Sequence, residues 1–277
     1  GRLRLLHEQE RGGVSLELPS QEVVAEDGTF ALRYEEALLV EDWNAQISLL
    51  TGMEAARISL EVGAGVLRTL PPPEDGTLAA IRRSARALHT PWPSFTSYPD
   101  FVRSIDAGQP TGAALLTQVA RAFRGAGYAA FHGPPPEQPL HAAVAAPYAH
   151  VTAPLRRLAD RYATECVLAG VAGEDPPEWV LAALPTLPEE VQAATRREGS
   201  LQRAVVDLLE ALVLRHRVGE VFPVTVTNRD DRGVTVQLAD PAVLARVKGV
   251  ALEPGSTVEL RLDAADPLQR TVTFTPV

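Results

Sequence analysis

The chain has 277 residues, of which 45% are hydrophobic and 22% are charged, and these ordinary values exclude a mainly disordered protein. Its 26 basic and 35 acidic residues give a net charge of -9, which excludes coating of nucleic acid through bulk positive charge but leaves room for a local basic channel. No run approaches the roughly 18 apolar residues of a membrane helix, and the single cysteine, Cys166, excludes an intramolecular disulfide. We therefore expect a soluble, cytoplasmic protein without a membrane partner.

The first part of the chain is predicted to contain short strands followed by a long helix. Residues 2–34 are typical of short strands, most simply a hairpin, because apolar and polar residues alternate over 13–18 and turn residues occupy 26–29. Apolar residues three and four positions apart then predict a helix over about 35–61, which Gly63 ends.

The middle of the chain is rich in proline. A helix led by three prolines is expected over 71–88, and another over 111–123. The stretch between them, 91–110, is predicted to be irregular or a single helical turn. Two short strands are expected at 128–131 and 141–144.

The last part changes from helices to strands. Helices are predicted from Pro154 to Gly170 and from about 188 to 217, the second interrupted or weakened at Gly199. After Gly219 come five strand-like runs separated by turn residues, which indicate a small barrel of the OB type. The runs are 221–227, 234–238, 243–247, 258–262 and 271–274.

The segment 148–160 carries the clearest chemical pattern. It reads as extended chain that enters a helix at Pro154, with Arg156 and Arg157 in the first turn beside free backbone N–H groups. Arginine side chains at the positive end of a helix dipole make a strong phosphate site. The alternative is that both arginines solvate the helix start and pair with Asp160.

This segment resembles the last signature of the RNB family, the exoribonucleases of the ribonuclease II and ribonuclease R type. The signature reads His-Phe-Thr-Ser-Pro-Ile-Arg-Arg-Tyr-x-Asp, and the matching positions are His150, Thr152, Pro154, Arg156, Arg157 and Asp160. The chain departs from it at Ala153, Leu155 and Leu158, and it carries Thr164 and Glu165 where the family has a His-Arg pair.

The resemblance extends over nearly the whole chain. Residues 40–57 look like the long RNB helix, and 65–68 with the following prolines look like the family's Arg-x-His-x-x-Pro stretch without its histidine. The resemblance implies an α+β fold: residues 1–217 form the C-terminal part of an RNB catalytic domain, with long helices packed on a mixed sheet or barrel. Residues 218–277 then form a five-stranded OB-type RNA-binding barrel.

The aspartate cluster that binds magnesium in RNB enzymes has no counterpart in this sequence. The only Asp-Asp pair, Asp230-Asp231, falls in a predicted hairpin turn of the barrel. The resemblance therefore implies that Mg²⁺ is held by ligands outside this chain, in an N-terminal RNB portion that acts as its partner. No metal ligand is expected within the chain.

The resemblance implies a 3′-to-5′ exoribonuclease that hydrolyses single-stranded RNA processively, with this chain inactive alone. Arg156 is the expected catalytic residue, because it would neutralise charge on the scissile phosphate. The expected RNA-binding residues are Arg157, Thr152, His150, Tyr148, Arg68 and Gln46. Two alternatives remain open: a non-catalytic RNA-binding or regulatory module derived from the RNB fold, and an unrelated helical interaction protein with a terminal barrel.

Overall fold

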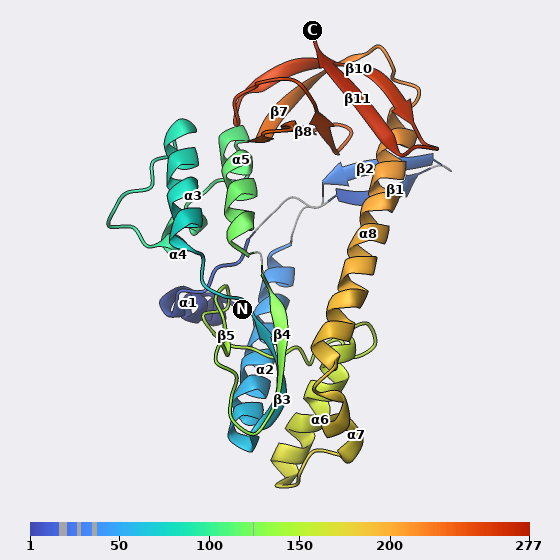
Figure 1. Cartoon of the computed structure of the whole chain (residues 1–277). Coiled ribbons are helices and arrows are strands. Elements are labelled where there is room, and N and C mark those ends of the chain that lie inside the picture. The colour runs from blue at the N-terminus through green and yellow to red at the C-terminus, as the bar shows by residue number, and fades with distance from the viewer. Residues whose placement is uncertain (17–20, 27–28, 35–37, 124) are drawn as a thin grey trace. The chain divides into compact units, whose positions relative to one another are not determined.

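The structure, a computed structural model, describes residues 1–16, 21–26, 29–34, 38–123 and 125–277 (Figure 1). The chain forms two compact units, each built from separate stretches of sequence. Unit 1 comprises Gly1–Ser15, Ala37–Glu74 and Ala122–Arg197, and unit 2 comprises Leu16–Glu36, Asp75–Arg121 and Glu198–Val277. The predicted division into residues 1–217 and 218–277 follows the family's domain order and stays a prediction.

Unit 1 is a helical layer around two short antiparallel ladders. Its helices are α1 (Arg2–Arg11), α2 (Leu39–Val62), α6 (Leu158–Ala172), α7 (Glu178–Ala183) and the first part of α8 (Leu187–Leu214). Its strands are β3 (Ala64–Thr69), β4 (Gly127–His132), β5 (Leu140–His141) and β6 (Ala146–Pro147). β3 pairs with β4, and β5 pairs with β6.

Strand β3 lies in the middle of unit 1, and both of its faces are covered. Side chains alternate across a strand, so successive residues of β3 enter different clusters. Val66 packs with Ala163 and Cys166 of α6, whereas Leu67 packs with Ala56 of α2. Arg68 shares the face of Val66 and is the register partner of Tyr128 on β4. The strand thereby brings an arginine to the edge of a buried core.

Unit 2 contains the barrel, a hairpin and three short helices. The hairpin pairs β1 (Gln21–Glu26) with β2 (Thr29–Tyr34), and the helices are α3 (Asp75–Ala87), α4 (Tyr98–Arg103) and α5 (Pro110–Val119), the last followed by the 3₁₀ turn η1 (Ala120–Phe123). The barrel strands are β7 (Val221–Asp230), β8 (Gly233–Leu238), β9 (Val243–Val247), β10 (Thr257–Asp266) and β11 (Thr271–Pro276).

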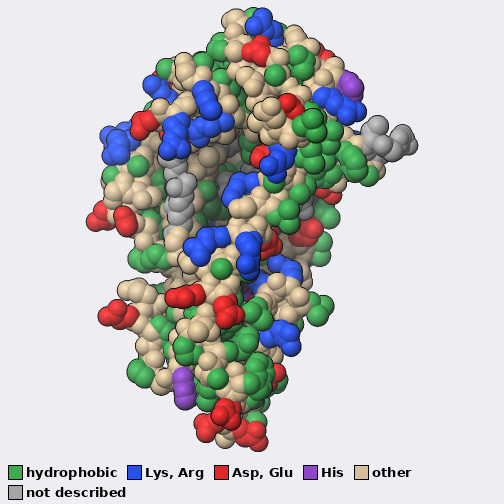
Figure 2. Space-filling model, turned by 45° about the vertical axis from the view of Figure 1, so that its right-hand side comes forward, with side chains coloured by type: hydrophobic (Ala, Val, Ile, Leu, Met, Phe, Trp, Pro, Cys, Tyr) green, Lys and Arg blue, Asp and Glu red, His purple; other side chains and the backbone are tan. Residues whose placement is uncertain are grey.

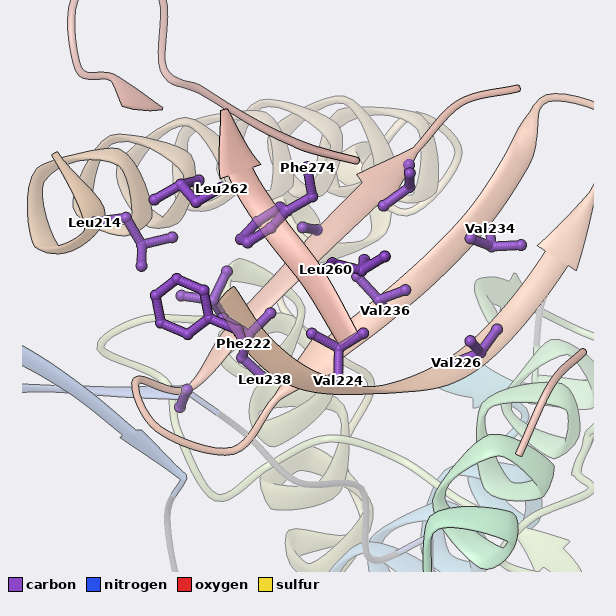
Figure 3. Packing of buried hydrophobic residues seen from close by; sticks show 14 of the residues in the cluster. Leu214, Phe222, Val224, Val226, Val234, Val236, Leu238, Leu260, Leu262 and Phe274 are labelled. Atoms are coloured by element: carbon purple, nitrogen blue, oxygen red, sulfur yellow. The ribbon is translucent and has the colours of Figure 1, made fainter. Parts of the chain in front are cut away.

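The barrel is antiparallel, with strand order β11-β10-β7-β8-β9, and β9 lies against β11 so that the sheet nearly closes. Register shifts in β7 and β10 bend these strands, as bulges do in small barrels. Inward-facing residues such as Val236 and Leu260 fill the interior, together with Leu214 of α8 (Figure 3). Leu32 of the hairpin belongs to the same core. The predicted α+β class and the five-stranded terminal barrel are confirmed.

The helices predicted from apolar spacing are confirmed with small shifts of their ends. The longest, α2 and α8, agree with the expected ranges, and α8 continues through Gly199 without a break. Gly63 ends α2 in the left-handed region at φ 75°, which glycine adopts without steric cost. The Glu41 carboxylate accepts a hydrogen bond from the Leu38 N–H at 2.8 Å and caps the start of α2.

Two predicted strand regions are wrong. Residues 2–11 form α1 rather than a strand, because leucine, arginine, glutamate and glutamine make up most of this segment and all favour helix. The hairpin prediction is confirmed only for β1 and β2, since 13–16 form no strand; residues 17–18 and 27–28, parts of the predicted strand and turn, lie outside the described residues. The strand expected over 141–144 ends at His141, whose carbonyl accepts the N–H groups of Val144 and Ala145 in a tight turn.

Candidate functional site

The signature segment enters its helix four residues later than predicted. Helix α6 begins at Leu158, so Arg156 and Arg157 precede it and do not lie in its first turn. The carbonyl of Ala153 accepts the N–H groups of both arginines, at 3.2 and 3.0 Å, and closes a turn over residues 153–157. The helix dipole argument for a phosphate site at Pro154 is therefore wrong, and the site depends on this turn.

A buried carboxylate holds the turn in place. Asp160, in the first turn of α6, has no exposed side-chain surface. Its Oδ2 accepts the Ala153 N–H at 2.7 Å, and its Oδ1 accepts Arg157 Nε at 2.9 Å. A second bond runs from the Arg157 guanidinium to Asp160 Oδ2 at 3.0 Å, which makes the pair bidentate. We call this arrangement the Asp160–Arg157 clamp.

The two arginines of the signature differ in their surroundings. The Arg157 side chain is only 23% exposed, and besides Asp160 it donates to Thr152 Oγ1 at 3.3 Å. Arg156 is exposed, and its guanidinium has no hydrogen-bond or ion-pair partner among the described residues. The pairing with Asp160, which the sequence offered as an alternative for both arginines, thus applies to Arg157. Arg156 remains available to an anion.

An aromatic cluster lies behind the turn. The hydroxyl of Tyr128 and Nδ1 of His150 are hydrogen-bonded at 2.7 Å. Tyr148, which is 8% exposed, meets the ring of His150 edge-on at 5.3 Å and that of His141 at 6.0 Å. The structure therefore brings His150 and Tyr148 together, and it adds Tyr128 and His141, which sequence reasoning did not select. Their positions depend on the pairing of β3 with β4 and on a tight turn, which no local motif announces.

Burial sets the protonation of this cluster. It lowers the pKa of His150 to about 4, with a further contribution from the positive charge of Arg157. Burial also lowers the pKa of His141 to about 4, and Arg68 adds to that effect. The pKa values of Tyr128 and Tyr148 are raised by burial. At neutral pH both histidines are thus uncharged, and His150 acts as a hydrogen-bonding group, not as a cation.

Arg68 joins the cluster from β3. Its N–H donates to the carbonyl of Tyr148 at 2.7 Å, which fixes the signature segment against the strand. Its guanidinium lies 4.7 Å from the centre of the Tyr128 ring, and Nη1 donates to the Gly127 carbonyl at 3.3 Å. Predicted residues from two distant stretches of sequence are therefore in contact.

Gln46 has a different environment. It is buried on α2, and its amide donates a hydrogen bond to Glu8 of α1, whose other oxygen accepts Ser15 Oγ at 2.8 Å. None of these partners belongs to the signature segment. The described contacts of Gln46 are those of a residue that joins two helices, and its predicted RNA contact stays a prediction.

Comparisons with known proteins bear on the fold of the chain. Residues 220–277 match the RNase II-type exonuclease C-terminal S1 domain. Mycoplasma genitalium RNase R, solved with ribose-methylated single-stranded RNA, superimposes on all of this chain with a TM-score of 0.85 at 16% identity. The resemblance to the RNB family is confirmed. No curated protein sequence matched the chain.

Two further solved structures share the fold. An active-site mutant of the Dss1 exoribonuclease from Candida glabrata covers 99% of this chain with a TM-score of 0.68 at 15% identity. Yeast Ssd1, described as a pseudonuclease, covers 79% with a TM-score of 0.59 at 18% identity. The chain spans 48% of the RNase R chain, 34% of Dss1 and 28% of Ssd1, so it corresponds to about half of RNase R or less of the others.

Residues that would hold the magnesium of an RNB enzyme are not found among the described residues, where no group of three or more His, Cys, Asp or Glu side chains could bind a metal ion. Asp230 instead pairs with Arg246 and accepts the Arg232 N–H at 2.8 Å, as expected of a hairpin turn. Among the helices that the structure describes, none is long and apolar enough to cross a membrane. Basic and acidic side chains are mixed on the face drawn in Figure 2.

Proposed function

We propose that this chain is the RNA-binding and phosphate-neutralising part of a 3′-to-5′ exoribonuclease that hydrolyses single-stranded RNA processively. The catalytic aspartates and their Mg²⁺ would belong to an N-terminal portion outside this chain, and the chain alone would be inactive. We place this activity in the cytoplasm as part of the same proposal. The observation that carries it is the exposed Arg156 beside the buried Asp160–Arg157 clamp. The fold around this site matches RNase R over the whole length of this chain.

The clamp gives Arg156 its chemical use. Asp160 and Arg157 fix the turn over 153–157 from the inside, so the backbone of Arg156 is held in place while its side chain is exposed. A preorganised guanidinium stabilises charge that develops on phosphate oxygens without reorganising during the reaction. The exposed Thr152 and the half-buried His150 would contact the approaching RNA, and the buried Tyr148 would contribute by supporting the ring of His150. Arg157 would add a longer-range charge to the same site.

A non-catalytic RNA-binding module is the second candidate. One observation favours it: the similarity to yeast Ssd1, which is described as a pseudonuclease. Both candidates predict that RNA binds beside Arg156. They differ only in whether the complete protein shortens RNA.

The binding part of the proposal is tested with this chain and a fluorescent single-stranded RNA, followed by anisotropy. Arg156→Ala should lower the affinity about tenfold and reduce the dependence on salt by about 0.7 in the log–log slope, the value for one phosphate contact on a single strand. Arg161→Ala is the matched control, since this arginine is exposed on α6 five positions away. Equal losses in both variants would mean that Arg156 contributes only general charge.

The catalytic part is tested with this chain together with its upstream region and a 5′-labelled single-stranded RNA. A ladder that shortens from the 3′ end only with Mg²⁺, and only when the upstream region is present, supports the exoribonuclease. In that complete form Arg156→Ala should slow cleavage about 100-fold or more. RNA that is bound and never shortened would establish the non-catalytic module instead.

A further inference from the structure

A small pocket lies beside Arg68 in unit 1, outside the signature turn. It has a volume of about 200 Å³ and is open on one side. Its walls come from the paired ends of β3 and β4 and from the start of α8. The side chains and backbone that matter here are Arg68, Gly127, Tyr128, Glu189, Gln192 and Thr195.

Arg68 supplies a flat cationic surface to this pocket. One face of its guanidinium covers the Tyr128 ring at 4.7 Å, and the bond to the Gly127 carbonyl fixes its plane. Arg68 also lines the pocket, so a planar ligand bound there would lie against this cation. A base stacked there would extend an existing stack of arginine on tyrosine.

The remaining polar groups of the pocket do not suit phosphate. Glu189 on α8 would repel it, and the charge of Arg68 is already shared with an aromatic ring and a carbonyl. A carboxylate, an amide and a hydroxyl, supplied by Glu189, Gln192 and Thr195, are instead groups that pair with the edges of bases. The volume is also below the 300–1,000 Å³ of pockets for drug-sized ligands, which fits one planar ring system.

We propose that this pocket binds a single RNA base, stacked on Arg68, whose amino group donates a hydrogen bond to the carboxylate of Glu189. This deepens the proposed function and rests on it. Cytosine, adenine and guanine carry such an amino group, whereas uracil has none and offers a carboxylate only its ring N3–H, which lies between two carbonyl oxygens. The pocket would therefore give the chain a preference against uracil at one position of the bound strand.

The test compares oligo(C) with oligo(U), because both are pyrimidines of similar size. Anisotropy titrations of this chain should give about tenfold tighter binding of oligo(C). Glu189→Ala should remove that difference. Glu190→Ala is the control: it deletes the same charge one position further along α8, where the side chain lies outside the pocket and contacts Thr186. Both variants lose one negative charge, so the ratio of the two affinities is the readout.

The possible results separate this inference from the function on which it rests. Equal binding of oligo(C) and oligo(U), with Arg156→Ala weakening both, overturns the base pocket and leaves the proposed function standing. A preference for oligo(C) that survives Glu189→Ala also overturns the pocket. Failure of the chain to bind either RNA overturns both proposals.

Discussion

At the scale of single residues, the site depends on one aspartate. Asp160 is fully buried in the first turn of α6, and its carboxylate accepts hydrogen bonds directly from the Ala153 N–H and from the Arg157 guanidinium. A buried carboxylate is tolerated only when its oxygens are paired, and here each accepts hydrogen bonds. Arg156, the neighbour of Arg157 in sequence, takes no part in these bonds, and its side chain is exposed.

Replacing Asp160 should therefore cost stability. Asp160→Asn keeps the size of the side chain but removes its charge and leaves Arg157 without a counterion. We expect a loss of about 3 kcal/mol in the free energy of unfolding, the lower end for broken buried pairs, because Arg157 is 23% exposed. Urea denaturation followed by circular dichroism measures it. Asp175→Asn, at an exposed acid after α6, should change the midpoint little, and equal effects would contradict the clamp.

The two buried histidines predict a loss of stability in mild acid. Their folded pKa values of about 4 lie below the unfolded value of about 6.5, so the unfolded state binds protons more readily. The stabilisation that the two neutral histidines provide should be complete above about pH 6.5, fall as the pH drops to 4, and be lost below that. Each histidine contributes on the order of 2–3 kcal/mol to this fall.

His141→Phe should flatten this dependence. It removes one titrating group and keeps an aromatic ring against Tyr148, and the buried Nδ1 of His141 has no hydrogen-bond partner among the described residues to lose. Unfolding free energies at pH 7.5 and 4.5 should lie closer together in this variant than in the original chain. His132→Phe, at an exposed histidine of β4, should leave the difference as it was. An unchanged difference in His141→Phe would mean that its burial does not control its protonation.

At the scale of elements, helix α2 contacts the signature segment at a glycine, Gly52. A Cβ built on Gly52 would lie 2.1 Å from the Tyr148 ring and 2.6 Å from the Ala149 carbonyl. Ala149 also donates its N–H to the Gly52 carbonyl at 3.0 Å. The helix and the segment approach so closely that only glycine fits between them.

Gly52→Ala should consequently destabilise the chain by about 1–3 kcal/mol and weaken RNA binding, because Tyr148 must move. The control is Gly76→Ala on α3, where a Cβ meets nothing within 4 Å. That change should be neutral or slightly stabilising, as alanine favours helix over glycine. Thermal melting and RNA titration of both variants decide the point; a neutral Gly52→Ala would show that the approach is looser than the structure indicates.

The same elements show how far the sequence could predict the site. The spacing of apolar residues predicted the helices α2 and α8. The signature pointed to Arg156 and His150 as site residues. The start of α6 could not be predicted, because Pro154 usually opens a helix, whereas here the Ala153 N–H donates to the Asp160 carboxylate and the residues before Leu158 form a turn. Tyr128 could not be predicted as a site residue for a similar reason: its position beside Arg68 comes from the register of β3 and β4.

At the scale of the whole molecule, the barrel of unit 2 has the largest described core. Leu260 is fully buried there, and its partner across the strand pair β7–β10 is Phe222 (Figure 3). Leu260→Ala should lower the free energy of unfolding by about 2–5 kcal/mol through lost burial and a residual cavity. Leu268→Ala, at a leucine that is 96% exposed, should change it by less than about 0.5 kcal/mol. Similar melting temperatures for the two variants would contradict the barrel core.

The hairpin's share in that core also affects how the protein is made. Leu32 packs among barrel residues, its carbonyl accepts the Ala242 N–H at 3.1 Å, and Gln21 donates to Glu210 of α8 at 2.7 Å. On the ribosome, Leu32 and Gln21 emerge long before any of these partners has been synthesised. The hairpin must therefore wait until Glu210 and Ala242 have been synthesised, with an apolar side chain uncovered, and a chaperone that shields it during that interval would raise the yield of folded protein.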